Sequence, residues 1–160
     1  MWTNKIYACL MISLLAAAFG ASIAHAVPGW EASMTATIST AENKLVFGQR
    51  ADARDGLDAR LDVPAMLGGD IQAYFAEGSD TLWRDIKGFH GGTKSWDVRI
   101  TSAIKNKPVV LRWKPEELRD AGTVTIKDTS TGTIVNMKEA STYSYINTTG
   151  TRDFTIEAAE

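Results

Sequence analysis

The sequence predicts an all-β fold: a single β-sandwich of about seven to nine antiparallel strands that follows a cleaved signal peptide. Three observations support this prediction. Short alternations of apolar and polar residues recur along the chain, turn-forming residues separate them about every ten residues, and no stretch after residue 26 keeps a helical period of 3.6 over three turns. A single sheet closed on itself is the less favoured arrangement of the same strands.

The first half of the predicted domain contains three strands. One is expected over 31–40, where every second residue is apolar, and another over the short apolar run 45–47, which a glycine ends. The polar stretch 49–70 is long for a loop in a compact domain, and loops of this length are often functional or partly disordered. A third strand is expected over 71–76, before a Gly- and Asp-rich loop at 77–93.

The second half repeats the same alternation. Strands are expected over 96–100 and 109–113, and Pro108 opens the latter where it need not donate a hydrogen bond. Residues 114–120 (KPEELRD) can form one helical turn with a proline at its start. A hairpin is expected over 124–137, with a turn of sequence DTSTG between its strands. The last two strands are expected around 143–145 and 154–156.

The N-terminus has the pattern of a secretory signal peptide. Lys5 precedes an apolar run at 6–18, and the segment closes on Ala24-His25-Ala26, a small-x-small cleavage pattern. The run is short for a membrane span, so we expect cleavage and no transmembrane anchor. Residues 1–26 are therefore assigned to the signal peptide and 27–160 to one β-sandwich domain, exported to the periplasm or to the extracellular space or cell surface.

Composition narrows the classes of partner. Only Lys5 of the 17 basic residues lies in the signal segment, so residues 27–160 carry a net charge of −3 with both signs interspersed. This charge gives no support to nucleic acid as a partner. The single cysteine, Cys9, also lies in the signal segment, so the domain has no disulfide and no cysteine ligands for a metal.

One segment resembles a known family. Residues 47–64 read FGQRADARDGLDARLDVP, which is similar to an A-x-D-G-x-D-x-x-x-D-x-P run in Ig-like modules of bacterial exported and surface proteins. Those modules also carry a tryptophan strand, an L-x-W strand and an L-x-D-x-x-T-G-x-x-V-x-M hairpin, matched here by Trp96, Leu111-Arg112-Trp113 and residues 126–137. The resemblance implies an Ig-like or fibronectin-like sandwich with a binding or structural role and no catalytic residues.

The aspartates of this segment are the candidate metal ligands. Four of them lie within eleven residues, and Gly56 allows a sharp turn between them: Asp52, Asp55, Asp58 and Asp62. Several oxygen ligands from one loop suit Ca²⁺. The spacing is not that of an EF-hand, and Arg54 and Arg60 offer the alternative of salt bridges on a solvated loop. The salt-bridged loop is the favoured interpretation and Ca²⁺ the minority one; no other cofactor is expected.

The remaining candidate residues for catalysis or ligand binding are one histidine and two tryptophans. His90 is the only histidine after residue 26, and a hydrolase would need it together with loop carboxylates, although no G-x-S-x-G motif surrounds a serine. Trp96 and Trp113 lie on alternating strands and are expected in the core. For Trp30 and Trp83, burial against a sheet edge is the favoured interpretation, and stacking on a sugar ring or anchoring a protein partner is the minority one.

The sequence thus favours an exported, non-enzymatic binding or structural module of the bacterial cell envelope, whose partner is an envelope or surface protein. Two alternatives remain open. One is a small secreted hydrolase that uses His90 and loop carboxylates, and the other is a carbohydrate-binding module that uses Trp30 and Trp83.

Overall fold

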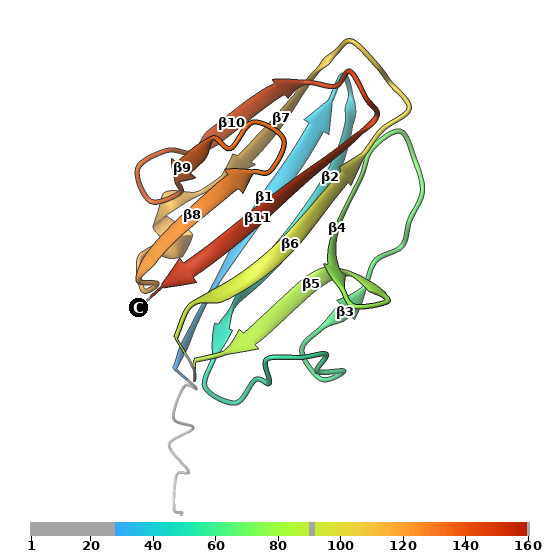
Figure 1. Cartoon of the computed structure of the whole chain (residues 1–160). Helices are drawn as coiled ribbons and strands as arrows, with labels where there is room; N and C mark the ends of the chain where they lie inside the picture. Colours follow the sequence, from blue (N-terminus) through green and yellow to red (C-terminus); the bar gives the residue numbers. More distant parts are fainter. Residues whose placement is uncertain (1–27, 90–91, 160) are drawn as a thin grey trace, which may run out of the picture.

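The computed structural model describes residues 28–89 and 92–159 (Figure 1). The predicted signal peptide, residues 1–26, and His90 lie outside the described residues. The described part is all-β, as predicted, with one short 3₁₀ helix, η1 (Pro115–Leu118), where the sequence predicted a helical turn. The strands are β1 (Gly29–Ile38), β2 (Ala41–Arg50), β3 (Val63–Pro64), β4 (Gln72–Glu77), β5 (Asp80–Gly88), β6 (Lys94–Thr101), β7 (Pro108–Trp113), β8 (Thr123–Asp128), β9 (Ile134–Asn136), β10 (Thr142–Ile146) and β11 (Thr151–Ala159).

These strands form one hydrogen-bonded sheet in the order β10-β7-β1-β2-β5-β4-β6-β11-β8-β9, and β3 pairs with β5. The prediction of seven to nine strands is therefore too low. The strands are not all antiparallel either, because β2 and β5 pair in parallel. Since the hydrogen-bonded ladder connects every described strand, the two separate sheets of a sandwich are not confirmed. No helix in 28–89 or 92–159 has the length and apolar character needed to cross a membrane.

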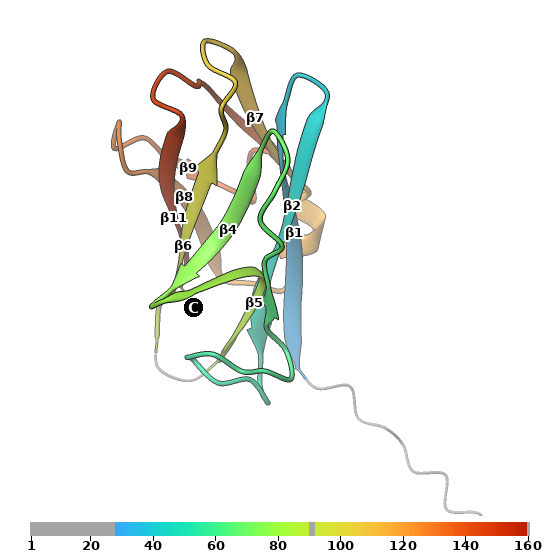
Figure 2. The ribbon, with the colours of Figure 1, turned by 90° about the vertical axis from the view of Figure 1, so that its right-hand side faces the viewer.

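The sheet folds over so that two layers face each other (Figure 2). Strands β1, β2 and β7 form one layer, and β4, β6, β8 and β11 form the other. Alternate side chains of β1 and of β6 are buried between the layers, as the period of two predicted. The aromatic centre of this core joins both layers: Phe47 lies edge-to-face against Trp30, Phe75 and Trp96, with ring centroids 5.5–6.4 Å apart.

Gly48 does not end β2, contrary to the sequence prediction, but allows β1 to approach it. The strand continues to Arg50, and Gly48 pairs with Glu31. A Cβ at this position would lie 2.2 Å from the backbone oxygen of Trp30, so any other residue would push the two strands apart. Because β2 continues to Arg50, its last five residues can pair in parallel with β5.

Side chains link the two ends of the strand order. Tyr143 of β10 donates a hydrogen bond to Asp128 of β8 at 2.7 Å, and Arg152 of β11 pairs with the same carboxylate at 2.6 Å. The Arg152 guanidinium also lies over the Tyr145 ring, 5.1 Å from its centroid. Burial alone would raise the pKa of Asp128, but hydrogen bonds from Arg152 and Tyr143 lower it below its ordinary value. These contacts leave the sheet nearly closed.

Candidate functional site

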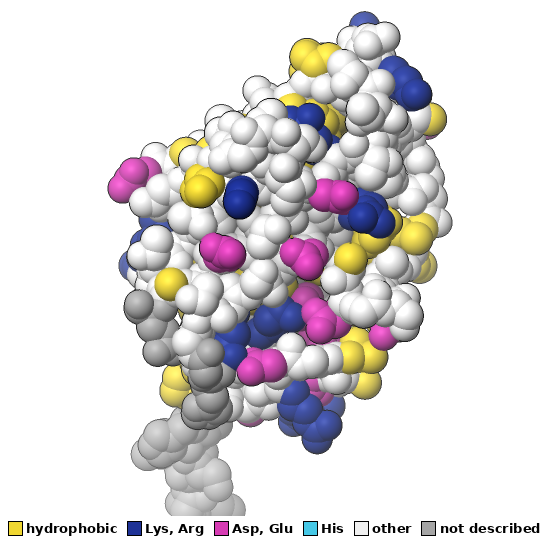
Figure 3. Space-filling view, viewed as in Figure 1, with side chains coloured by type: hydrophobic (Ala, Val, Ile, Leu, Met, Phe, Trp, Pro, Cys, Tyr) yellow, Lys and Arg dark blue, Asp and Glu magenta, His cyan; other side chains and the backbone are white. Residues whose placement is uncertain are grey.

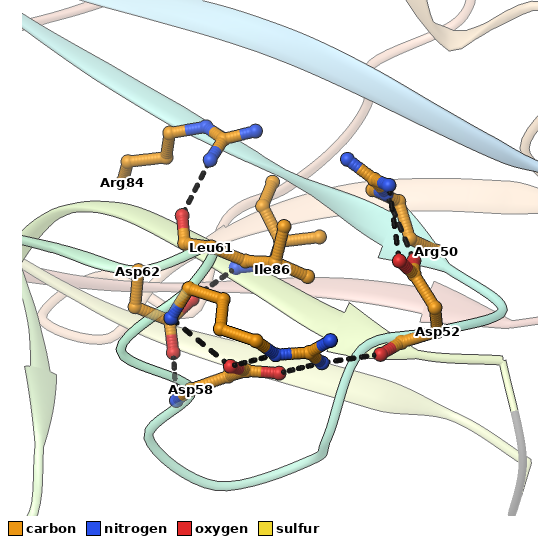
Figure 4. A network of polar contacts seen from close by, with 8 residues as sticks. Arg50, Asp52, Asp58, Leu61, Asp62, Arg84 and Ile86 are labelled. Atoms are coloured by element: carbon orange, nitrogen blue, oxygen red, sulfur yellow. Dashed lines mark hydrogen bonds and ion pairs between the residues drawn. The ribbon is translucent and has the colours of Figure 1, made fainter. Parts of the chain in front are cut away.

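Arg60 neutralises the first carboxylate of the aspartate loop (Figure 4). Asp58 is buried and accepts hydrogen bonds from Nε and Nη2 of Arg60 at 3.1 and 2.7 Å. The same Nη2 donates to the backbone oxygen of Asp52, which closes the loop on itself. These hydrogen bonds lower the pKa of Asp58 to about 2. Asp58 is therefore held as a carboxylate by a cation that the loop itself supplies.

The other three aspartates also have protein donors. Asp62 accepts hydrogen bonds from the backbone N–H groups of Asp58 and Ile86, at 2.6 and 2.9 Å, and so attaches the loop to β5 (Figure 4). Asp52 pairs with Arg50 at 3.0 Å, whereas Asp55 points to Lys94 at 2.8 Å.

The Ca²⁺ hypothesis therefore concerns four carboxylates that already bind different protein groups. Within residues 28–89 and 92–159, no three Asp, Glu, His or Cys side chains form a group that could hold a metal ion. Of the two arginines that were predicted to form salt bridges with the aspartates of this loop, Arg60 pairs with Asp58. No ion pair of Arg54 is found among the described residues.

A charged cluster fills the gap between the second half of β5 and the first half of β6. It consists of Asp55, Glu77, Asp85, Lys87 and Lys94. No ladder joins the two strands here, because β4 lies between them and pairs only with the first half of β5 and the second half of β6. Lys87 Nζ lies 3.0 Å from Glu77 and 3.3 Å from Asp85. Figure 3 shows basic and acidic side chains side by side over this part of the molecule.

Asp85 is the least satisfied member of the charged cluster. It is 3% exposed, and its Oδ2 has no hydrogen-bond partner in the described residues despite the nearby Lys87 ammonium. Burial raises the pKa of Asp85 to about 6, and the positive charge of Lys87 only partly opposes this effect. A buried carboxyl group with a raised pKa can hold or release a proton near neutral pH.

Of the four tryptophans in the described residues, three are buried in the core, and Trp83 packs against the core beside a hollow. Trp96 and Trp113 are buried, which confirms the prediction; their Nε1 groups donate to the backbone oxygens of Asp85 and Met137. Trp30 is also buried, at 5% exposure, and donates to Gln49 at 3.0 Å. Of the two alternatives for Trp30, burial is therefore the one found, and its ring is not available for stacking on a sugar.

Trp83 remains the candidate tryptophan for binding a sugar or a protein partner. It is half-buried and borders a hollow of about 230 Å³ together with residues of β2, β4 and the segment after β3, namely Asn43, Lys44, Ala65, Met66 and Ala73. We call this the Trp83 hollow. The lining residue Met66 is 93% exposed, and Leu67, which follows it in the chain, is 51% exposed. Figure 3 shows hydrophobic side chains at the edge of the molecule where this segment runs.

A hydrolase that uses His90 would also need a serine, for which the chain offers Ser79, Ser95 and Ser102. Ser79 and Ser95 are exposed, whereas Ser102 is buried and donates to the backbone oxygen of Asp70 at 2.6 Å. With His90 outside the described residues, its relation to any of these serines stays a hypothesis. Sequence reasoning missed Asn43, Lys44 and Met66 as lining residues because they lie on segments that meet only in the fold; an isolated methionine in a Gly-rich loop was the available signal.

The sequence matches no protein-family model, and no curated protein and no solved structure matches it. The likeness to Ig-like modules of bacterial exported and surface proteins therefore rests on short motifs in residues 47–64 and 126–137 and around Trp96 and Trp113.

Proposed function

We propose that this protein is an exported, non-enzymatic binding module of the bacterial cell envelope, and that the Trp83 hollow with its neighbours Met66 and Leu67 is its binding surface. Localisation is proposed from the signal-peptide pattern at residues 1–26. The Ig-like character of the domain is proposed from the motif resemblance, which implies the same class of function.

The observation that carries the proposal is the exposure of Met66. A methionine that is 93% exposed, next to a half-exposed leucine and a hollow beside a tryptophan, makes an apolar patch on the surface. Such patches on soluble proteins mark sites of interaction. Methionine is well suited to this role because its unbranched, polarisable side chain adapts to a partner.

Carbohydrate binding is the second candidate function, and Trp83 favours it. An aromatic ring next to the Asn43 amide offers an apolar surface and hydrogen-bonding groups within one small hollow. Trp30 no longer supports this candidate, because the ring is in the core.

The experiment compares capture of envelope components by the wild-type domain and by a variant with both Met66→Ser and Leu67→Ser. We expect the wild type to retain a specific component and the double variant to lose it. Ile134→Ser is the matched control, since Ile134 is 61% exposed on β9 and does not border the hollow. Equal capture by all three proteins would refute the proposed surface, and turnover of an envelope polymer by the wild type would refute the non-enzymatic assignment.

A further inference from the structure

Strand β10 is one of the two ends of the strand order, so one of its sides pairs with no other strand (Figure 1). On its other side it pairs with β7, and the backbone N–H of Asn147 donates to the Lys107 oxygen just beyond that ladder. Hydrogen-bonded positions alternate in an antiparallel pair. The backbone N–H and C=O groups of Thr142, Ser144 and Ile146 therefore point away from β7, and we call these three residues the β10 edge.

The β10 edge is a row of free backbone donors and acceptors. Its three residues are exposed, and no partner for these backbone groups is found in residues 28–89 and 92–159. Strand β9, at the other end of the strand order, is shorter, and its Asn136 oxygen already accepts hydrogen bonds from Glu139 and Ala140. An extended segment that adds as a strand would complete the hydrogen bonds of the β10 edge.

Half-buried aromatic rings lie on the core side of this strand. Tyr143 and Tyr145 pack against Phe154, yet both stay only half-buried. On the outer face Ile146 is 54% exposed, so nothing in the described residues covers that end of the edge. Paired strands place neighbouring side chains on the same face, so apolar residues at every second position of an added strand would cover the tyrosine rings.

The charges beside the β10 edge are positive. Arg112 of β7 lies opposite Thr142, and Lys107 precedes Pro108, which lies opposite Ile146. Both cations are exposed, and neither has an ion pair within the described part of the chain. A strand added to β10 would lie two strand spacings from β7, about 10 Å, which is close to the Debye length at 0.1 M salt. Acidic residues on the outer face of that strand would therefore be attracted.

We propose that the β10 edge binds an extended segment of a partner protein, which adds to the sheet as a strand and carries acidic residues on its outer face. The added backbone forms hydrogen bonds to the β10 edge, its apolar side chains cover the tyrosine rings, and its carboxylates face Arg112 and Lys107. A second copy of this chain is the less suitable occupant, since β10 (TYSYI) contains no acidic residue. The β10 edge shares no residue with the Trp83 hollow, so this inference goes beyond the proposed function.

NMR titration of the protein with an acetylated heptapeptide of alternating glutamate and valine tests this inference. We expect saturable shifts at the backbone amides of the β10 edge. Binding should be about twofold to fivefold weaker in Arg112→Gln, because one exposed charge interaction is lost. Arg54→Gln, which changes another exposed arginine without an ion pair in the described residues, should bind as the wild type does. The matching peptide of lysine and valine should bind more weakly, because its charges are repelled.

Ser144→Pro tests the role of the backbone. It removes an N–H group that points away from β7 and leaves the ladder with β7 intact, so peptide binding should fall at least about tenfold while the fold survives in thermal melting. Ser144→Ala removes only the hydroxyl group and should bind as the wild type does.

N-methylated peptides make the same test on the wild-type protein. Residues of the added strand that lie opposite the β10 edge have their side chains on the outer face, so the glutamates supply the N–H groups that meet β10. N-methylation of the glutamates should therefore abolish binding, and N-methylation of the valines should not.

Four results would overturn the inference. They are no saturable binding of the glutamate–valine peptide, shifts confined to residues outside β10, equal binding of the two N-methylated peptides, or equally tight binding of the lysine–valine peptide. A concentration-dependent dimer in sedimentation velocity that disappears in Ser144→Pro would also overturn it, because the β10 edge would then bind a second copy.

Discussion

Replacement of Asp85 by asparagine should stabilise the protein above about pH 6. Burial raises the pKa of Asp85 from its ordinary value of 3.8 to about 6. A folded state that binds a proton more tightly than the unfolded chain loses stability as the pH rises from about 4 to 6. The difference of roughly two pKa units corresponds to about 3 kcal/mol, lost in full once the pH exceeds 6.

Asparagine at position 85 imitates the protonated carboxyl group, so it avoids this loss. Lys87 keeps Glu77 as its ion-pair partner at 3.0 Å in the variant, and it also donates to the backbone oxygen of Asp55 at 3.4 Å. We therefore expect Asp85→Asn to be more stable than the wild type by about 3 kcal/mol at pH 8 and nearly equal to it at pH 4.

Urea unfolding of both proteins from pH 4 to pH 8 measures this difference directly. Asp120→Asn, which changes an exposed aspartate, serves as the control for removal of one negative charge. The reasoning is refuted if Asp85→Asn is no more stable than the wild type at pH 8. A stability difference that stays constant from pH 4 to pH 8 would also contradict it, because titration of Asp85 would then not be its cause.

Three further predictions concern the core, the contacts of Asp128 that link the two ends of the strand order, and the aspartate loop. Trp96→Ala should destabilise the domain by about 3–5 kcal/mol in chemical unfolding, because a fully buried ring is removed; a loss below about 1 kcal/mol would place this ring outside the core. Arg152→Ala should cost about 3–5 kcal/mol near neutral pH, since it leaves the buried Asp128 carboxylate without its ion pair, and an unchanged unfolding midpoint would contradict that role. Melting curves with Ca²⁺ and with excess chelator should coincide, whereas an increase of several degrees that disappears in Asp55→Asn would establish a Ca²⁺ site.

Strands with uniform alternation were predictable from the sequence. Residues 31–40 alternate because β1 presents one face to the core and one to solvent, and the 124–137 hairpin has a turn of suitable composition. Strand β5 was missed and assigned to a loop. Its charged residues Asp85 and Lys87 are buried in the charged cluster, so the apolar–polar alternation that identifies a strand is absent there.

The candidate site was predictable only in part. The sequence pointed to Trp83 as a residue without a clear place in the core, and also to Trp30, which the fold buries. Which of the two rings reaches the surface depends on where the pairing between β2 and β5 ends. The position of that end is set by contacts between residues that lie far apart in the sequence. Local patterns carry no information about such a separation.

Hydrogen exchange of a protein comprising residues 27–160, with and without a solubilised envelope fraction, tests the central claim most directly. A binding module that uses the Trp83 hollow should show slower exchange on β2 near Asn43, in the segment after β3 and on β5 near Trp83 when the fraction is added. The region of the charged cluster should exchange as before. Slower exchange confined to the charged cluster, or no change anywhere, would contradict the account.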